Sequence, residues 1–192
     1  MNILLATQNP HKIAELRAVL PEGWSVQVPS DFGIVGELAE DGSRLEENAA
    51  QKARFLWERT GMPSLADDSG LEVDALFGEP GVASAQYAGP QRSDADNRRK
   101  LLDALGSSLN RTARFRTVLA WATETGVVLA AGEVRGRIAL AEKGTQGFGY
   151  DSLFVPDEGD GRSFAEMSLS EKSALSHRSR AVATWLALLQ KS

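Results

Sequence analysis

Two adjacent carboxylates mark the segment at residues 64–70, which reads Ser-Leu-Ala-Asp-Asp-Ser-Gly. Neighbouring side chains of an extended chain point to opposite faces, so one of Asp67 and Asp68 can face a ligand while the other braces the chain. A carboxylate held at the end of a strand suits metal binding or the activation of a water molecule. Asp, Ser and Gly are also common turn residues, so a simple turn is the alternative interpretation of this segment taken alone.

A second polar cluster, Thr7-Gln8-Asn9-Pro10-His11-Lys12, separates a short apolar run from a helical pattern. The free backbone N–H groups at the start of that helix would form an anion site, to which Lys12 adds a charge and Asn9 a neutral donor. The alternative is that Asn9 caps the helix and Pro10 takes its first position. The two roles do not exclude each other.

Acidic residues and a lysine surround the start of a helix predicted at residues 45–60. Glu46, Glu47 and Asn48 fall in its first turn, where they complement the helix dipole, so a structural role suits them. Glu40 lies in the preceding loop and is freer to bind a metal. Lys52 is the charged residue of this cluster that we select as a functional candidate.

A fourth cluster joins the loop Gly147-Phe148-Gly149-Tyr150-Asp151 to Lys172 and to Ser176-His177-Arg178. An aromatic ring between two glycines is left exposed for stacking on a flat ligand, although Phe148 suits a plug beneath a turn equally well. Ser176 is a suitable N-cap, which would place His177 and Arg178 at the start of a helix.

The elements between these clusters are typical of an α/β fold with a mixed sheet. Apolar residues at helical spacing follow the first strand, and only Glu124-Thr125-Gly126 separates two segments rich in β-branched and aromatic residues, which indicates an antiparallel hairpin. The expected strands are residues 3–7, 25–29, 114–123, 127–135 and 153–155. The expected helices are residues 11–20, 45–60, 94–105 and a last helix that ends near 189.

The composition fits one soluble domain over residues 1–192, with 42% hydrophobic and 24% charged residues. A net charge of -5 argues against sequence-independent binding of nucleic acid, which needs a basic face. The absence of cysteine excludes a thiol nucleophile and a thiolate metal site. No apolar run is long enough for a signal peptide or a membrane-spanning helix, so we expect a cytoplasmic protein without a membrane partner.

Seven short motifs occur in a fixed order, and together they resemble the inosine/xanthosine triphosphate pyrophosphatase family. They are Thr7-x-Asn9-x-x-Lys12, Glu47-Asn48-Ala49 with Lys52-Ala53, Asp67-Asp68-Ser69-Gly70-Leu71, Pro80-Gly81-Val82, Gly147-Phe148-Gly149-Tyr150-Asp151, Glu171-Lys172-Ser173 and Ser176-His177-Arg178. The resemblance covers the chain from residue 3 to about residue 189. One departure is Gln86, which stands where many members of the family carry an arginine. Glutamine cannot supply the positive charge of that arginine.

The resemblance implies a two-lobed ITPase-like α/β fold, with a long curved mixed sheet and the active-site cleft between the lobes. It implies magnesium-dependent hydrolysis of dITP, ITP and XTP to the monophosphate and pyrophosphate by a homodimer. Asp68 resembles the catalytic carboxylate that also binds the metal, and Glu40 matches the second metal residue. The residues that resemble the triphosphate site are Thr7, Gln8, Asn9, Pro10, His11, Lys12, Lys52 and Ser69. Those that resemble the pocket for the base and sugar are Phe148, Gly149, Tyr150, Asp151, Lys172, His177 and Arg178.

The chemistry agrees with that assignment, because attack on the α-phosphorus needs a base, a metal and cations that take up charge on the departing pyrophosphate. Hypoxanthine and xanthine carry O6 where adenine carries an amine, so a donor such as His177 or Arg178 would select them.

Two alternatives remain from the sequence, and two others lack the residues that they require. A septum-inhibitor-like pyrophosphatase of related architecture would prefer pyrimidine or modified nucleotides, and the Ser-His-Arg motif argues against it. A nucleotide sensor on the same fold would bind ITP without turnover. A P-loop kinase lacks its Gly-x-x-x-x-Gly-Lys motif here, and a zinc deaminase lacks its cysteines.

Overall fold

The computed structural model describes residues 1–36 and 38–190 of the chain. Contacts divide it into two compact units. Unit 1 comprises Met1–Asp68, Thr117–Gly132 and the described part of Arg178–Ser192, and unit 2 comprises Ser69–Arg116 and Glu133–His177. Three strands contribute residues to both units: β3 (Ser64–Val73), β5 (Thr112–Thr123) and β6 (Gly126–Ile138).

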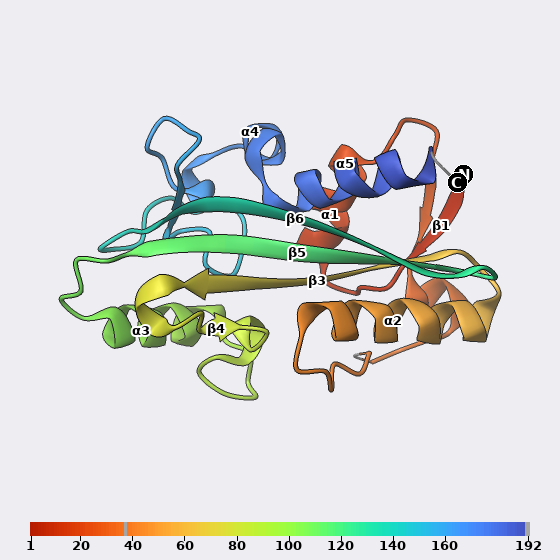
Figure 1. Cartoon of the computed structure of the whole chain (residues 1–192), viewed down its shortest axis with the longest axis horizontal. Coiled ribbons are helices and arrows are strands. Elements are labelled where there is room, and N and C mark those ends of the chain that lie inside the picture. The colour runs from red at the N-terminus through yellow and green to blue at the C-terminus, as the bar shows by residue number, and fades with distance from the viewer. Residues whose placement is uncertain (37, 191–192) are drawn as a thin grey trace. The chain divides into compact units, whose positions relative to one another are not determined.

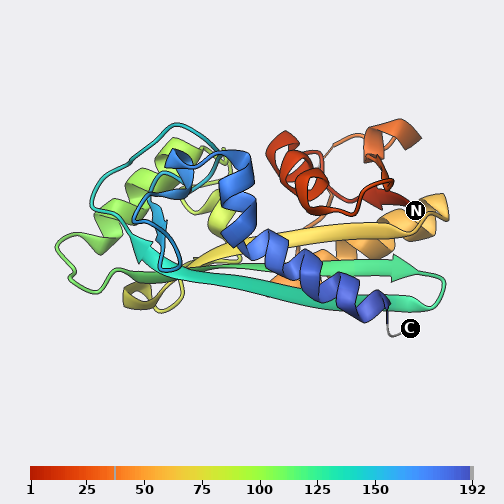
Figure 2. The same ribbon diagram turned by 90° about the horizontal axis from the view of Figure 1, so that it is seen from above.

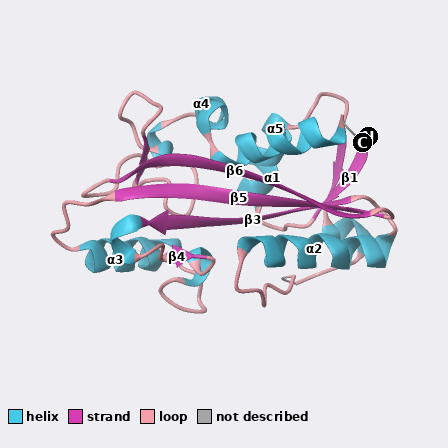
Figure 3. Cartoon of the chain, viewed as in Figure 1, coloured by secondary structure: helices cyan, strands magenta, loops and turns pink. Residues whose placement is uncertain are grey.

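Within the described residues the strands form one mixed sheet with the order β2-β1-β3-β5-β6-β7, and β4 pairs with β3 off this path. The shorter strands are β1 (Asn2–Leu5), β2 (Ser25–Gln27), β4 (Pro80–Gly81) and β7 (Phe154–Pro156). β1 runs parallel to β2 and β3, whereas β4 is antiparallel to β3 and β7 is antiparallel to β6. The expected mixed α/β class is therefore confirmed, as the colouring by secondary structure shows (Figure 3). The cleft between lobes stays a prediction.

Unit 1 has helices on both faces of its strands. α1 (Pro10–Val19) and α5 (His177–Leu189) lie on one face and α2 (Leu45–Thr60) lies on the other, as Figures 1 and 2 show. Strand alternation explains both faces, because odd-numbered Leu65 packs with α1 and α5 while its neighbour Ala66 packs with α2. The same alternation separates Ile3 from Leu4 and Trp121 from its neighbours.

The helix ends follow the capping rules. α2 ends before Gly61, whose φ of 68° is the left-handed conformation that glycine adopts without steric cost. In unit 2 the side chain of Ser93 accepts a hydrogen bond from the backbone N–H of Asp96 and so caps α3 (Asp94–Leu105). The predictions of helices at residues 45–60 and 94–105 are confirmed at both ends.

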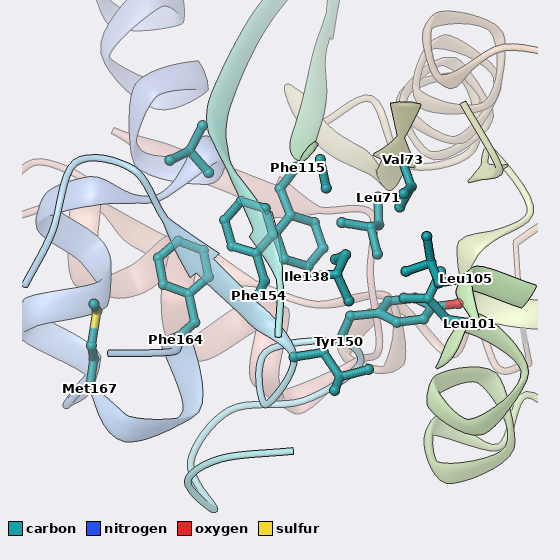
Figure 4. Packing of buried hydrophobic residues seen from close by; sticks show 13 residues of the cluster. Leu71, Val73, Leu101, Leu105, Phe115, Ile138, Tyr150, Phe154, Phe164 and Met167 are labelled. Carbon is teal, nitrogen blue, oxygen red and sulfur yellow. The ribbon is translucent and has the colours of Figure 1, made fainter. Parts of the chain in front are cut away.

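The core of unit 2 is built from aromatic rings and leucines (Figure 4). The ring of Phe115 lies 4.7 Å from that of Phe154, and α3 contributes Leu101 and Leu105 to the same cluster. α4 (Leu169–Leu175) follows this core along the chain. Burying rings together stabilises the unit through the apolar area removed from water, with a further contribution from tilted ring contacts.

The turn interpretation of residues 64–70 is wrong, because the whole segment lies inside β3. Pairing with neighbouring strands outweighs the local preference of Asp, Ser and Gly for turns. Gly70 is needed there for another reason: a Cβ atom at this position would lie 2.4 Å from the backbone oxygen of Gly81 in β4. Glycine thus permits the close approach of β3 and β4.

Trp185 provides a test of the unit 1 core. Its buried ring lies 5.1 Å from that of Trp121 and 5.6 Å from that of Trp24, in a T-shaped contact. Trp185→Ala should lower the free energy of unfolding by about 3–5 kcal/mol, because it leaves a cavity among these rings. Urea unfolding measures it, and Leu109→Ala, at a fully exposed position, should stay within about 0.5 kcal/mol of the parent protein. Equal losses in the two variants would contradict the packing described.

Candidate active site

The side chain of Asp68 meets a lysine and an asparagine from α2 in unit 1. Lys52 Nζ lies 3.0 Å from Asp68 Oδ1, 2.6 Å from Glu40 Oε1 and 2.8 Å from the backbone oxygen of Asp67. Asn48 Nδ2 donates to Asp68 Oδ2 at 3.2 Å. Asn48 and Lys52 are four residues apart in α2, so the helix presents both to β3 from the same buried face.

Burial and charge set the acidity of this group. Burial and the nearby charge of Glu40 raise the pKa of Asp68, against the opposing effect of Lys52 and Lys12. Burial alone would lower the pKa of Lys52, yet Asp68 and Glu40 raise it above its ordinary value. The lysine therefore stays protonated, and Asp68 becomes a better proton acceptor than an exposed aspartate.

Asp68 and Glu40 provide the oxygen ligands that suit magnesium. Both carboxylates reach the same Lys52 Nζ, which shows that they can share one cation. The described residues contain no group of three or more His, Cys, Asp or Glu that could hold a metal ion. Magnesium is commonly held by one or two carboxylates together with water and substrate phosphates, so a pair of carboxylates fits that ion.

Asp67 points to the other face of β3, where it joins a buried ion-pair network. Lys12 Nζ lies 3.1 Å from Asp67 Oδ1, and Arg178 Nε and Nη2 donate to Asp67 Oδ2 at 3.1 and 2.9 Å. Arg178 Nη1 also pairs with Glu15 of α1. Burial by itself would raise the pKa of Asp67, but Lys12 and Arg178 outweigh it and hold the pKa well below its usual range.

The two aspartates are thus separated in the way that strand alternation predicts. Asp67 shares the face of Leu65 with α1 and α5, and Asp68 shares the face of Ala66 with α2. Asp67 is a structural residue that ties three elements of unit 1 together. Asp68 faces the polar group that can do chemistry.

Arg178 differs from the expectation that it donates to the base. The side chain is 2% exposed, and its guanidinium lies between the carboxylates of Asp67 and Glu15. Those two partners hold the pKa of Arg178 above its ordinary value in spite of burial. This geometry gives Arg178 a structural role in unit 1 and argues against a direct role in reading O6.

The start of α1 differs from the expected free anion site. The side chain of Asn9 accepts hydrogen bonds from the backbone N–H groups of His11 and Lys12. The backbone oxygen of Asn9 accepts from the N–H of Ile13, and Pro10 has no N–H. The capping interpretation is therefore confirmed, and the prediction of free N–H groups at this helix start is wrong.

Side chains remain available for an anion at the same loop. Thr7 Oγ1 accepts from the backbone N–H of Asn9, which leaves its own hydroxyl proton for another partner. Gln8 and His11 are exposed, and Lys12 is partly exposed beside Asp67. The binding roles of residues 7–12 stay predictions.

In unit 2 an ion pair supports the loop of residues 147–151, which we call the aromatic loop. Asp151 Oδ2 accepts from the backbone N–H of Phe148 at 2.9 Å and pairs with Lys172, which is buried. Lys172 Nζ lies 5.2 Å from the centre of the Phe148 ring. The ring is partly exposed and is no member of the hydrophobic core clusters, so the structure does not support its interpretation as a core plug.

Tyr150, by contrast, belongs to the core rather than to an open pocket. Its ring is buried among the leucines of α3, and its hydroxyl donates to the backbone oxygen of Ser84 at 2.9 Å. Burial raises the pKa of its hydroxyl group. The expectation that the Tyr150 side chain lines the base pocket is therefore corrected: this residue anchors the loop.

His177 and Ser69 are the remaining candidates of unit 2. The ring of His177 is buried and stacks on that of Phe115 at 4.7 Å, and α5 begins at this residue, as expected. Ser69 follows Asp68 along β3 and is partly buried. The binding roles of both stay predictions.

Two polar residues that contact the candidate side chains were not predicted to do so. Asn48 was assigned to the helix dipole but donates to Asp68, and Glu15 was not selected but pairs with Arg178. A signal existed for both. Asn48 interrupts the buried face that Leu45, Ala49 and Leu56 define, and Glu15 lies three residues after Lys12, on the same side of α1.

The model of the Ham1 family matches residues 3–188. The chain belongs to the Ham1 family. It is 48% identical to a dITP/XTP pyrophosphatase of Syntrophobacter fumaroxidans, over 94% of this chain and 78% of that protein. It is 40% identical to a dITP/XTP pyrophosphatase of Flavobacterium johnsoniae, over 98% of both chains.

A solved structure leads to the same family. The HAM1 protein from Coxiella burnetii superposes with a TM-score of 0.88 at 37% identity, and the match covers 100% of both chains. The resemblance that the seven motifs indicated is therefore confirmed. Among the described residues, none of the helices has the length and apolar character required to cross a membrane.

The two aspartates should separate in mutagenesis. Asp67→Asn leaves Lys12 and Arg178 short of a buried counter-charge, so it should cost about 3–5 kcal/mol of unfolding free energy. Asp68→Asn should cost clearly less, because burial already disfavours the charged form of that residue. Urea unfolding of both variants measures the difference. An equal or larger loss for Asp68→Asn would contradict the structural role given to Asp67.

The low pKa of Asp67 also predicts how stability depends on pH. A carboxylate whose pKa is depressed by folding stabilises the protein above its unfolded pKa, and that contribution disappears as the pH falls toward the folded pKa. The stability gap between the parent protein and Asp67→Asn should stay constant from pH 7 to 5 and shrink below about pH 4. Unfolding in EDTA at several pH values measures the gap, and a gap that is as large at pH 3 as at pH 7 would refute the expectation.

Proposed function

We propose that this chain hydrolyses dITP, ITP and XTP to the monophosphate and pyrophosphate with magnesium. The observation that carries the proposal is the polar cluster of unit 1, in which the carboxylates of Asp68 and Glu40 both pair with the ammonium group of buried Lys52. Support comes from the relatives, which are named dITP/XTP pyrophosphatase and align over nearly the whole chain. The reaction breaks the bond between the α- and β-phosphates.

Asp68 is the residue that we assign as general base. Its raised pKa brings the carboxylate nearer to the acidity of a group that accepts a proton from water at neutral pH. Asn48 donates to the Oδ2 atom and Lys52 to the Oδ1 atom, so the carboxylate is fixed in orientation before substrate binds. Fixed orientation lowers the entropy cost of the reactive arrangement.

Magnesium, when bound to Asp68 and Glu40, supplies positive charge that offsets the charge of the triphosphate. Lys12 and Lys52 add charge from side chains of the chain itself. Both are held by acidic partners, at 3.1 Å from Asp67 and 3.0 Å from Asp68, so their ammonium groups are ordered in advance. Such preorganised cations stabilise charge that develops on the departing pyrophosphate.

We assign the binding of the nucleobase to unit 2. The partly exposed ring of Phe148 offers a stacking surface, and Lys172 beside it adds a cation. Because Arg178 is engaged by Asp67 and Glu15, His177 becomes our preferred donor to O6 of hypoxanthine or xanthine. Adenine presents an amine at that position and would leave the donor unpaired.

Pyrophosphate release across a nucleotide panel tests the proposal. ITP, dITP and XTP should be hydrolysed faster than GTP, ATP, dTTP and UTP, and EDTA should abolish the activity. Preference for dTTP or UTP would point instead to the related pyrimidine-directed class. Binding of ITP without turnover, seen as a thermal shift, would point to a nucleotide sensor.

Asp68→Asn tests the role of Asp68 as general base within that panel. Loss of general-base catalysis should lower kcat by about a hundredfold to ten-thousandfold while the protein stays folded. Asp103→Asn, at an exposed position of α3, is the matched control and should retain parent activity. Substantial turnover by Asp68→Asn would remove this residue from the chemistry. The proposed homodimer is tested separately, by light scattering on the purified protein.

A further inference from the structure

One residue of the aromatic loop in unit 2, Gly149, is held by one helix at both its backbone N–H and its backbone C=O. The backbone N–H of Gly149 donates to Asp94 Oδ2 at 2.7 Å, and the backbone oxygen of Gly149 accepts from Arg98 Nη1 at 2.9 Å. Asp94 and Arg98 are four residues apart in α3 and therefore share one side of that helix. Both contacts join segments more than fifty residues apart in the chain.

Further contacts attach the neighbours of Gly149 to the same helix. The next residue, Tyr150, packs its ring with Leu101 and Leu105 of α3, as Figure 4 shows. Arg98 Nε lies 2.9 Å from Glu142 Oε2. The same Glu142 oxygen accepts from the hydroxyl of Ser152, which directly follows the loop in sequence. α3 thus contacts the loop and its neighbours through several residues.

The loop needs this external support because its own sequence supplies little stiffness. Gly147 and Gly149 have φ values of 73° and 59°, in the left-handed region. Glycine reaches that region freely but also many others, so two glycines around Phe148 leave its ring poorly determined by the backbone alone. Charge-assisted hydrogen bonds to the N–H and to the C=O of Gly149 fix the peptide planes on both sides of its Cα atom and so remove that freedom.

We propose that Asp94 and Arg98 are positioning residues, which fix the backbone of Gly149 on both sides of its Cα atom and thereby hold the Phe148 ring ready to stack on the substrate base. The inference rests on the proposed function, since it takes Phe148 as the stacking surface. Neither side chain acts on the phosphates in this assignment. Their effect is on the binding of the base.

The kinetic consequence follows from where the contact acts. Stacking on the base stabilises the bound substrate and the transition state alike, so its loss raises KM and leaves kcat nearly unchanged. Stacking one base on an aromatic ring affects binding by about tenfold. Asp94→Ala and Arg98→Ala should therefore each raise the KM for ITP by about tenfold, with kcat within about threefold of the parent value.

Conservative and control variants separate positioning from general damage to α3. Asp94→Asn keeps an oxygen that accepts from the Gly149 N–H and should restore most of the parent KM. Asp96→Ala and Arg99→Ala change the same helix turns, but their side chains pair with each other and not with the loop. Both controls should keep the parent KM. Equal KM increases in the controls and in Asp94→Ala would overturn the proposal.

Hydrogen exchange supplies a readout that does not depend on turnover. The Gly149 amide, observed by NMR in the nucleotide-free protein, should exchange at least tenfold faster in Asp94→Ala than in Asp96→Ala. We call the two contacts of Asp94 and Arg98 with the Gly149 backbone the clamp. Unchanged exchange would overturn the clamp itself. If the parent protein hydrolyses no nucleotide while its Gly149 amide behaves as expected, the proposed function fails and the clamp stands. If the parent protein is active and the KM values do not move, the positioning role fails alone.

Discussion

The buried ion pair between Asp67 and Arg178 is the interaction on which unit 1 depends. It joins β3 to α5 across 111 residues of sequence, and Glu15 and Lys12 extend it to α1. Two carboxylates and two cations balance each other there, which offsets the large cost of removing charges from water. Since removing one member exposes the others to that cost, the network holds the three elements in one arrangement.

Fixing Asp67 also decides where Asp68 points. Successive residues of a strand face opposite sides, so an aspartate committed to α1 and α5 directs its neighbour to α2. There Asn48 and Lys52 receive it. The pair of acids therefore combines a structural member of low pKa with a chemical member of raised pKa, and the difference comes from the partners on each face.

Local patterns predicted the elements well and their long-range partners poorly. The bounds of α2 and α3 follow from apolar spacing and from Gly61 and Ser93 at their ends, which are properties of neighbouring residues. The partners of Asp68 and Arg178 lie far away in sequence, so local patterns can mark Asn48 and Glu15 as polar residues of a helix but cannot reveal which side chains they meet. The turn interpretation of residues 64–70 is wrong for the same reason. Their turn-forming composition is a local property, whereas the strand pairing that overrides it involves residues far away in sequence.

The two units hold their candidate functional groups by different physical means. Unit 1 fixes its side chains through buried charges, with the structural group around Asp67 on one face of β3 and the chemical group around Asp68 on the other. Unit 2 fixes a loop mainly through its main chain, at the N–H and C=O of Gly149 and the N–H of Phe148. A main-chain anchor does not depend on the side chain displayed beside it. The ring at position 148 can therefore be chosen for its contact with a ligand, while the order of the loop comes from Asp94, Arg98 and Asp151.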